Sequence, residues 1–512
     1  MRNFIINQQL SRNRSVSPYG NFYKVIISLV LVLIVTACSS NQIKLIGIWH
    51  AEFEAVPNLK ADFDFELQND LFSNNWSGRI EIAELMITAP LAEVSVKDSK
   101  ITLNLGNGAD FKGNISEDKT VIAGVLNAPN RKPQTLRFTK ATKWSSQVPA
   151  RVDKNNQNIK KWAYVLPQTI DDGWKVGFLS KTSSESKPLN ELFQKIVDGK
   201  YQGLDALLVA QDGKLVLEEY FYLGGREKIH SIQSATKSVT SLLLGIAYDD
   251  GLIKNLDAPL KSFFPAYPDS VKNGPESATL RHALTMSAGL DWEESIPYTD
   301  PKNDAVRMNQ SKDMYQYVLS KNPDLKDQPG KKFEYNSGLS VLLGGVILDV
   351  TGKPADKYAE LTLFKKLGIK KFWWERGNEQ IHTGGGLFMQ PRDIMKLGQL
   401  VLDEGKWDGE QVISKSWIKE STALRLPISE LNKQAGYGYQ WWRGACTVDK
   451  KIFPVIFAAG YGGQVLYIIP DLNLVVLTLH HNPSEADLSH SIAWSELEKM
   501  IIPAFLPVTF NQ

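Results

Sequence analysis

The sequence predicts an α+β protein in which an antiparallel sheet is flanked by helices and preceded by a small all-β domain. Three observations indicate this. Short alternating runs fill residues 47–142, strand-like hairpins stand near both ends of residues 189–512, and helical patterns lie between those hairpins. Period-two alternation is typical of half-buried strands, and a spacing of three to four residues is typical of helices. Strands at both ends of one domain with helices between them favour a single covered sheet.

The size and composition of the chain limit what it can be. With 512 residues it is too long for one ordinary core, so we expect at least two domains. Lys and Arg total 58 and Asp and Glu total 56, a balance that gives no support for a nucleic-acid partner. Its two cysteines, Cys38 and Cys446, exclude a disulfide framework and a cysteine-rich metal site.

The N-terminus has the pattern of a secretory signal. The apolar run Val25–Val35 ends in Val35-Thr-Ala-Cys38 and follows four basic residues, Arg2, Arg12, Arg14 and Lys24. Val-Thr-Ala-Cys resembles a bacterial lipoprotein cleavage box, which implies a signal peptide over 1–37, lipidation of Cys38 and a tether over 38–46. The residue after the cysteine is Ser39 rather than Asp, which resembles the pattern of lipoproteins sorted to the outer membrane. We expect an exported protein anchored at the periplasmic face of that membrane; the alternative is an uncleaved anchor helix.

Residues 47–142 predict an antiparallel meander that forms a barrel or half-barrel. Trp49 and Trp76 are expected to fill its interior. For the domain as a whole, a structural or docking role is favoured over the binding of a carried ligand. The strand-like runs are 63–67, 80–82, 94–96, 101–105 and 136–138. Residues 143–188, rich in Lys, Asn, Ser and Pro, predict a linker that lies along the next domain.

In residues 189–512, two hairpins are expected. The first joins residues 204–210 to 215–222 through Asp212-Gly213, a strong turn signal. The second joins residues 464–469 to 474–479, and a closing helix is expected over 487–500. The paired His480-His481 could hold zinc, but packing or surface roles are favoured, so no metal site is predicted.

Ser234 begins a predicted helix that Gly251 ends. Its apolar residues share one face: Val239, Leu242, Leu243, Ile246 and Ala247. Lys237 comes one turn after Ser234, so both side chains project from the same face. A hydroxyl is a weak nucleophile until a neighbouring base takes its proton, and a desolvated lysine can serve. This pair has the arrangement that a serine acyl-transfer enzyme needs.

The spacing alone is also typical of an N-cap serine followed by a solvated lysine. Ser-x-x-Lys recurs at Ser116–Lys119, Ser184–Lys187 and Ser416–Lys419. Context distinguishes Ser234, because Tyr335 lies on a predicted loop just before a second apolar helix, Leu339–Val350. A tyrosine beside ammonium groups can act as general base and acid, although a packing role is the usual one for such a residue.

Five segments, in order, resemble the serine β-lactamase and penicillin-recognising enzyme superfamily: Ser234–Lys237, Leu280–Leu290, Phe333–Ser337, Gly384–Asp393 and Ala459–Gln464. The likeness covers residues 189–505 and is closest to the class C-like branch of esterases, D-aminopeptidases and 6-aminohexanoate-dimer hydrolase-like amidases. It implies a β-lactamase/transpeptidase-like fold and a reaction that needs no metal or organic cofactor.

The resemblance also assigns roles to single residues. Ser234 would be the acylated nucleophile, Lys237 its activating neighbour, and Tyr335 the group that passes the proton to the leaving group. The oxyanion hole would combine the Ser234 N–H with one from Gly460–Gly463. Losing one such donor costs on the order of 3 kcal/mol of barrier. Further substrate-binding candidates are Tyr461, Gly462, Gly463 and Ser337.

Two departures from the family pattern narrow the expected substrate. Tyr335-Asn-Ser337 replaces the usual Tyr-x-Asn, and Gly460-Tyr461-Gly462 stands in place of Lys-Thr-Gly, which removes the cation that would hold a substrate carboxylate. We therefore expect a serine hydrolase for small esters or amides. The alternatives are a β-lactamase or D,D-peptidase, and a catalytically silent penicillin-binding-like lipoprotein. The oligomeric state is left open.

Overall fold

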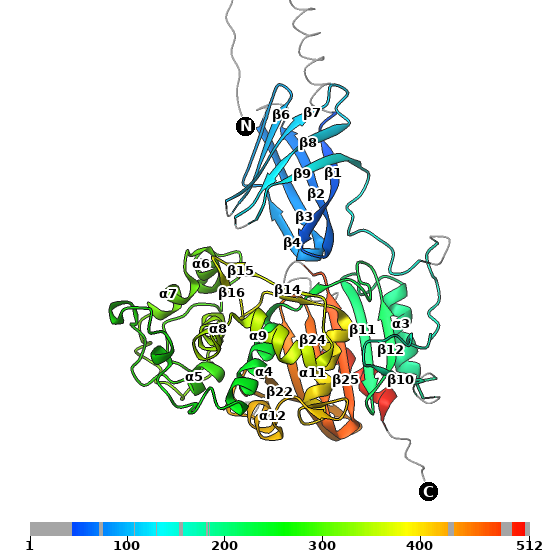
Figure 1. Cartoon of the computed structure of the whole chain (residues 1–512). Helices are drawn as coiled ribbons and strands as arrows, with labels where there is room; N and C mark the ends of the chain where they lie inside the picture. The colour runs from blue at the N-terminus through cyan, green and yellow to red at the C-terminus, as the bar shows by residue number, and fades with distance from the viewer. Residues whose placement is uncertain are drawn as a thin grey trace, which may run out of the picture.

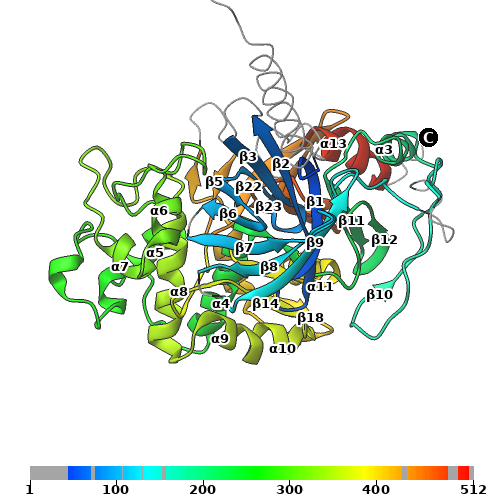
Figure 2. The same ribbon diagram turned by 90° about the horizontal axis from the view of Figure 1, so that it is seen from above.

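The computed structural model describes residues 44–70, 75–106, 108–129, 131–152, 157–180, 183, 185–428, 435–482 and 494–506. The expected signal peptide, Cys38 and most of the expected tether lie outside these residues. Figure 1 shows a β-rich body above a larger body of strands and helices. Seen from above in Figure 2, the β-rich body covers the middle of the larger one, with α5–α8 to one side and α3 and α13 to the other.

The β-rich body, here the β-domain, is one nine-stranded antiparallel sheet in the order β4-β3-β2-β1-β9-β8-β7-β6-β5. Its strands are β1 (Gly47–Val56), β2 (Leu59–Asp70), β3 (Asn75–Ile82), β4 (Ile87–Pro90), β5 (Glu93–Lys97), β6 (Lys100–Gly106), β7 (Ala109–Ile115), β8 (Val121–Asn127) and β9 (Gln134–Ala141). Leu91 and Ala92 connect the two edge strands, β4 and β5. The Leu91 N–H donates to the Gly78 carbonyl of β3, and the Ala92 N–H donates to the Asn104 carbonyl of β6, each at 2.9 Å. These bonds link β3 to β6 and draw the sheet toward a closed barrel.

Aromatic side chains fill the interior of the β-domain. Trp49 is fully buried and stacks on Phe65, whose ring also meets the edge of Phe138 at 4.7 Å between centroids. Trp76 is half-buried and packs against the margin of this core, so of the two tryptophans expected inside only Trp49 fills the interior. All five strand-like runs predicted in this domain are confirmed.

The larger body, here the hydrolase domain, is built on a second nine-stranded sheet in the order β10-β12-β11-β25-β24-β23-β22-β21-β20. Its strands are β10 (Lys175–Val176), β11 (Leu204–Gln211), β12 (Lys214–Tyr220), β20 (Leu426–Pro427), β21 (Gly436–Tyr437), β22 (Trp442–Val448), β23 (Lys451–Gly460), β24 (Gln464–Ile469) and β25 (Leu474–His480). Asp212 and Gly213 both have positive φ, 49° and 73°, as a tight hairpin turn requires. The pairing of β11 with β25 joins the two ends of the domain.

Helices cover both faces of this sheet. Alternate residues of β11 face opposite sides, so Leu208 packs with α4 (Thr236–Asp249), α8 (Ser337–Thr351) and α11 (Pro391–Leu402), whereas Leu207 packs with α3 (Lys187–Val197) and η7 (Leu497–Ile501). The predicted fold class, an antiparallel sheet between helices, is confirmed. The remaining α-helices are α5 (Leu280–Leu284), α6 (Asp304–Gln310), α7 (Met314–Leu319), α9 (Ala355–Leu361), α10 (Leu363–Leu367), α12 (Lys415–Thr422) and α13 (Trp494–Glu496).

Short strands complete the domain, and three of them form a small sheet in the order β13-β17-β14. They are β13 (His230–Ser231), β14 (Phe372–Trp374) and β17 (Leu387–Met389), besides the pairs β15 (Arg376–Gly377) with β16 (Gln380–Ile381) and β18 (Lys406–Trp407) with β19 (Glu410–Gln411). Across the described residues, no single helix is long and apolar enough to cross a membrane; α8 and α9, bent by 61° at their junction, pass that test as a pair.

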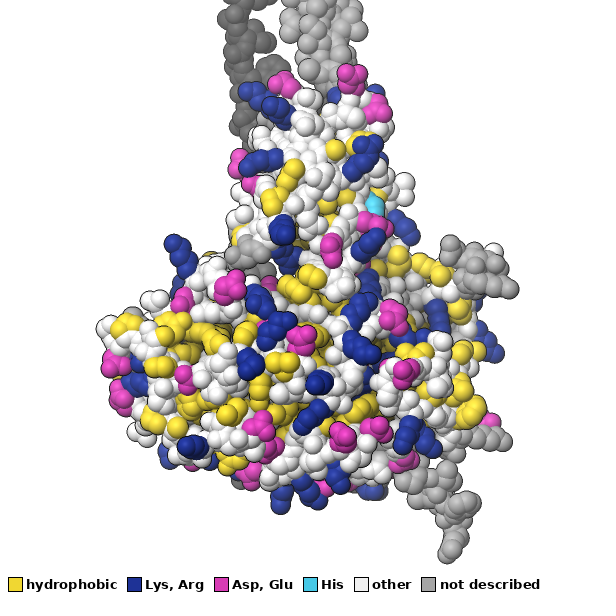
Figure 3. Space-filling view, viewed as in Figure 1, with side chains coloured by type: hydrophobic (Ala, Val, Ile, Leu, Met, Phe, Trp, Pro, Cys, Tyr) yellow, Lys and Arg dark blue, Asp and Glu magenta, His cyan; other side chains and the backbone are white. Residues whose placement is uncertain are grey.

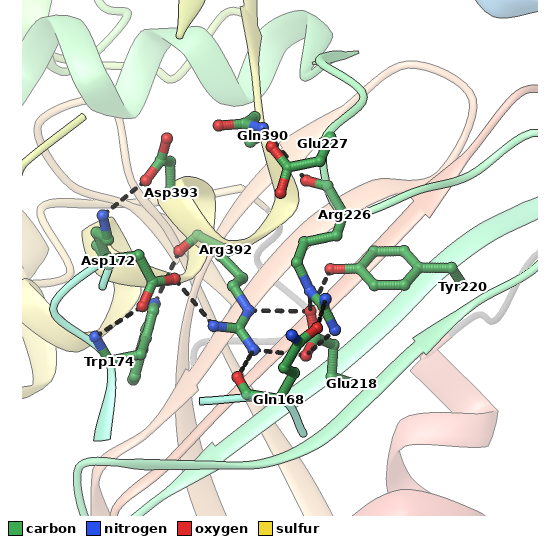
Figure 4. A network of polar contacts seen from close by, with 11 residues as sticks. Gln168, Asp172, Trp174, Glu218, Tyr220, Arg226, Glu227, Gln390, Arg392 and Asp393 are labelled. Atoms are coloured by element: carbon green, nitrogen blue, oxygen red, sulfur yellow. Dashed lines mark hydrogen bonds and ion pairs between the residues drawn. The ribbon is translucent and has the colours of Figure 1, made fainter. Parts of the chain in front are cut away.

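The segment between the two domains is tied to the hydrolase domain by a buried arginine, as Figure 4 shows. Arg392, at the start of α11, forms ion pairs with Asp172 at 3.0 Å and with Glu218 at 2.6 Å, and donates to the Gln168 carbonyl at 2.6 Å. Burial alone would raise the pKa of Glu218, but Arg392 and Arg226 outweigh burial and lower that pKa to about 2. Arg392 lies within the Gly384–Asp393 motif. Its contacts with Asp172, Glu218 and Gln168 give this motif residue a structural role.

The β-domain rests on the hydrolase domain through a small apolar cluster. Val56 and Leu59 of the β-domain pack against Ile229 and Phe388, which adjoin or belong to β13 and β17. Beside this contact, a cavity of about 600 Å³ opens between the domains. Lys, Arg, Asp and Glu side chains are interspersed over both domains on the face in Figure 3.

Candidate active site

Ser234 lies in a short 3-10 turn, Gln233–Ala235, that runs directly into α4. The turn is held from one side by β17, because the Ile232 N–H donates to the Leu387 carbonyl at 3.0 Å and the Leu387 N–H donates to Thr236 Oγ1 at 3.2 Å. Gln233 has a left-handed φ of 47°, an uncommon conformation for a residue other than glycine. Ser234 is half-buried, whereas most of the α4 residues that follow it are buried.

Lys237 connects the parts of the site. It is only 2% exposed, and its Nζ lies 2.9 Å from Ser234 Oγ and 3.0 Å from Ser337 Oγ. It also donates to the Gly384 carbonyl and lies 5.0 Å from the centroid of the Tyr335 ring. Three sequence segments far apart in the chain therefore meet around Lys237 Nζ, and they include the three residues predicted to be catalytic.

Tyr335 stands just before α8, on an aromatic wall. Its ring stacks on Trp442 with 5.9 Å between centroids and 17° between planes. The next residue, Asn336, caps α8, since its side-chain oxygen accepts the Leu339 N–H at 3.0 Å. That bond turns the Asn336 amide toward the helix start, so the Ser337 hydroxyl reaches Lys237 instead. This explains how the site accommodates Tyr335-Asn-Ser337 in place of Tyr-x-Asn.

Glu294 also belongs to the site, although it stands in no motif that sequence analysis selects. The carboxylate is 9% exposed and accepts both the hydroxyl of Ser337 at 2.5 Å and its backbone N–H at 2.7 Å. Trp292 Nε1 donates to it at 2.7 Å and the Tyr298 hydroxyl at 2.8 Å. Because the Ser337 proton points at Glu294, Lys237 is the donor in the bond to Ser337 Oγ. The result is a chain of hydrogen bonds from Glu294 to Ser234.

The glycine-rich turn 461–463 lies between β23 and β24 and packs against the residues just before Ser234. A Cβ on Gly460 would overlap the Ile232 carbonyl oxygen, so only glycine fits there. Gly462 and Gly463 have φ of 78° and 98°, which other residues rarely adopt. The Tyr461 ring meets the Tyr298 ring edge-on at 5.6 Å. Four of the predicted substrate-binding or oxyanion positions are thereby placed beside the nucleophile.

Side chains hold all three carbonyls of this turn. The Gln464 amide donates to the Tyr461 carbonyl at 3.1 Å, and the Asn482 amide donates to the Gly462 carbonyl at 2.9 Å. His480 Nδ1 lies 2.8 Å from the Gly463 carbonyl. Because each peptide is planar and trans, fixing a carbonyl also fixes the direction of the N–H that follows it. The backbone of the turn is therefore held rigid, and the Gly463 N–H donates to the Gly460 carbonyl at 3.3 Å. Rigid backbone of this kind suits an oxyanion hole.

His480 and His481 turn to different partners. Burial lowers the pKa of His480 to about 4, so it is neutral where it faces the Gly463 carbonyl. His481 Nδ1 lies 2.8 Å from Asp205, and His230 Nε2 lies 2.9 Å from the other oxygen of the same carboxylate. Asp205 thus ties the end of β25 to the segment that leads into Ser234.

The arrangement has the parts of an acyl-transfer site. Ser234 has a nitrogen base within hydrogen-bonding distance, the base has an oriented partner in Ser337, and a rigid turn of N–H groups lies alongside.

Comparison with known proteins agrees with this geometry. The sequence pattern of the Beta-lactamase family matches residues 189–498. The 6-aminohexanoate-dimer hydrolase of Paenarthrobacter ureafaciens is 25% identical over 323 residues, which cover 58% of this chain and 76% of that protein. A Salmonella typhi protein named as a D-alanyl-D-alanine carboxypeptidase is 26% identical over 381 residues, covering 60% of this chain and 84% of the relative.

A solved structure shows the same fold. It is a Bacillus anthracis protein named as a 6-aminohexanoate-dimer hydrolase, with a TM-score of 0.52 and 21% identity, and the match covers 67% of this chain and 87% of that one. The family match, which spans more than half of the chain, and the Ser234–Lys237 pair lead to one conclusion: the protein belongs to the Beta-lactamase family and is a serine hydrolase.

Proposed function

We propose that this protein cleaves small esters or amides through an acyl-enzyme formed on Ser234. The observation that carries the proposal is the 2.9 Å contact between Lys237 Nζ and Ser234 Oγ. In acylation, Lys237 Nζ takes the Ser234 proton while Oγ bonds to the substrate carbonyl carbon. Tyr335 relays this proton from Lys237 to the departing alcohol or amine as the bond to that group breaks. Water then attacks the acyl-enzyme, releases the acid and restores the Ser234 hydroxyl.

Ser337 and Glu294 support the base in this scheme. When Lys237 takes the proton it becomes an ammonium ion, and the Ser337 oxygen at 3.0 Å accepts a hydrogen bond from it. Glu294 polarises Ser337 through the bond at 2.5 Å and thereby stabilises the developing positive charge. The N–H of Ser234 and one from the turn 461–463 are proposed to bind the oxyanion.

The proposed substrate has no carboxylate beside the scissile bond. Aromatic rings line the neighbourhood of Ser234, with Tyr335 stacked on Trp442 and Tyr298 against Tyr461. Gly460-Tyr461-Gly462, in place of Lys-Thr-Gly, supplies no ammonium group for a substrate carboxylate. A relative named as a 6-aminohexanoate-dimer hydrolase supports this proposal, and one named as a D-alanyl-D-alanine carboxypeptidase supports D,D-peptidase action as the second candidate.

The decisive assay uses the full chain and Ser234→Ala. Each is incubated with a fluorophosphonate, p-nitrophenyl acyl esters, a linear aminohexanoate dimer and a chromogenic cephalosporin. Ester or amide turnover that is lost in Ser234→Ala supports the proposal. Turnover of the cephalosporin alone favours the β-lactamase alternative, and absence of labelling and of turnover favours a silent binding protein.

We further propose that the protein is a lipoprotein of the periplasmic face of the outer membrane, anchored through Cys38. The basic start, the apolar run Val25–Val35 and the sequence Val-Thr-Ala-Cys support this. Cells grown with a clickable palmitate analogue should label the wild type and leave Cys38→Ala unlabelled. Equal labelling of the two proteins would contradict the anchor.

A further inference from the structure

The β-domain reaches the glycine-rich turn of the hydrolase domain through Met86. This residue follows the 3-10 turn η1 (Ala83–Leu85), is 7% exposed and has a left-handed φ of 56°. Its sulfur lies 3.4 Å from Gln464 Nε2, and a Cβ on Gly462 would lie 3.1 Å from it. The left-handed conformation ends the 3-10 turn, because the Met86 N–H donates to the Ala83 carbonyl at 2.9 Å.

Gln464, the residue that Met86 contacts, holds the turn in place. It is 1% exposed, and its amide group makes three hydrogen bonds to the backbone, which use both N–H hydrogens, so the Met86 sulfur lies against the amide as a packing contact. The side-chain oxygen accepts the His480 N–H at 2.9 Å, while the nitrogen donates to the His480 carbonyl at 2.7 Å and to the Tyr461 carbonyl at 3.1 Å. A displacement of this amide would therefore release the Tyr461 carbonyl and, with it, the direction of the N–H groups of the turn.

The contacts around Met86 anchor the β-domain beside the nucleophile as well. Lys228 Nζ lies 3.1 Å from the Glu84 carboxylate, two residues before Met86. Val56 and Leu59 pack against Ile229 and Phe388, and Phe388 belongs to the strand that holds the Ser234 turn. The β-domain thus contacts both halves of the site, the segment before Ser234 and the turn 461–463.

We propose that Met86 is a positioning residue supplied by the β-domain, which keeps the turn 461–463 in the geometry that stabilises the oxyanion. This inference rests on the proposed function of that turn. Because oxyanion donors act mainly on the transition state, loosening the turn lowers kcat more than it changes KM. The β-domain then contributes to the rate of the reaction through its contact with the turn 461–463.

The test uses full-length Met86→Ala, with Met86→Leu as the conservative variant and Ile87→Ala as the matched control. Ile87 is the next residue, and its side chain is 36% exposed. We expect kcat of Met86→Ala to fall by roughly tenfold, a fraction of the 10²–10³ that loss of a whole donor costs, with KM changed less than about twofold. Met86→Leu restores most of the rate, and Ile87→Ala behaves as wild type. An unchanged kcat in Met86→Ala overturns the inference.

A second measurement does not depend on turnover. Hydrogen–deuterium exchange of the peptide containing residues 460–465 should be faster in Met86→Ala than in wild type or Ile87→Ala, and unchanged exchange overturns the inference. If the wild type neither turns over substrate nor labels at Ser234, the proposed function fails on its own. Exchange still decides whether Met86 positions the turn.

The ion pair at the same contact gives an independent check. Lys228→Glu and Glu84→Lys each place like charges together and should slow turnover, and the double variant should recover most of the loss. Lys112→Glu, which breaks an exposed ion pair with Asp110 within the β-domain, is the control and should have no effect. Equal loss in the single and double variants would count against positioning through this contact.

Discussion

Glu294 accepts both the hydroxyl of Ser337, at 2.5 Å, and its backbone N–H, at 2.7 Å. One carboxylate therefore fixes where the Ser337 oxygen points, and that oxygen faces Lys237. Lys237, the proposed base, therefore has an oriented hydrogen-bond partner in Ser337 and a buried carboxylate behind that partner. This arrangement matches the general one of a nucleophile, a nearby base and a group that orients the base.

Glu294→Gln keeps the size of the side chain and removes its charge. We expect kcat/KM to fall by about tenfold or more, because the charge that develops on Lys237 loses its stabilising anion. Glu294→Asp keeps the charge and should retain more of the activity than Glu294→Gln. A kcat/KM in Glu294→Gln equal to that of wild type would show that the charge of Glu294 does not assist the reaction.

Lys237→Ala removes the base itself. Labelling of Ser234 by a fluorophosphonate should slow by on the order of 10³, while the thermal transition persists, because the buried space left can be taken by water or neighbouring side chains. Lys237→Arg is the matched charge control and should also label slowly, since a guanidinium does not act as a base. Labelling of Lys237→Ala at the wild-type rate would exclude the role given to this lysine.

Gly460→Ala tests the fit between the turn and the nucleophile segment. An added Cβ overlaps the Ile232 carbonyl, so the backbone must shift, at a cost of about 1–3 kcal/mol in the free energy of unfolding. We expect slower acylation together with a lower Tm. Gly225→Ala is the control, because its Cβ meets only Lys228 Cβ at 3.7 Å. Equal Tm and labelling rates in the two variants would mean that the turn does not pack as described.

Asp205 links pH to stability through its two histidines. Burial alone would lower the pKa of His481, but attraction to Asp205 outweighs burial and raises it above the usual 6.5. Burial alone would raise the pKa of Asp205, but His481 and His230 hold it well below its usual 3.8. The His481 contribution is fully present below pH 6.5 and is lost as pH rises through its raised pKa. The Asp205 contribution is present above pH 3.8 and is lost as pH falls through its lowered pKa.

The Tm difference between wild type and Asp205→Asn should therefore be largest between about pH 4 and 6.5 and should shrink toward pH 9. Burial lowers the pKa of the neighbouring His480 to about 4, so this histidine stays neutral through most of this pH range and adds little to the difference. Thermal melts of both proteins across this range are the measurement. A Tm gap that stays constant from pH 4 to 9 would contradict the assigned pairing.

Local patterns in the sequence were enough to predict hairpins and helices and to place Ser234 and Lys237 one helical turn apart. The hairpin at Asp212-Gly213 and the helices after Ser234 and Ser337 follow from turn chemistry and periodicity, which act between near neighbours. The likeness of five motifs to a known superfamily added Tyr335 and the turn 461–463. The structure places these groups around Lys237 or beside the nucleophile segment, although their roles still await the experiments above.

Groups that reach the site across long chain separations could not be found in this way. Glu294 is 43 residues from Ser337, and Met86 is 378 residues from Gln464. Neither stands in a periodic pattern or a motif, because each contact exists only after the domains have packed. The sequence showed the departure at Tyr335-Asn-Ser337 but not its consequence, because the Asn336 amide caps α8 and the next residue contacts Lys237.

The most direct test of the account is the site and rate of acylation. The full chain is mixed with a p-nitrophenyl ester, quenched on the millisecond-to-second scale, digested, and analysed by mass spectrometry. We predict a transient acyl adduct on the peptide that contains Ser234, formed with a burst of nitrophenol and absent in Ser234→Ala. An adduct on another residue, or turnover that persists in Ser234→Ala, would contradict the central claim.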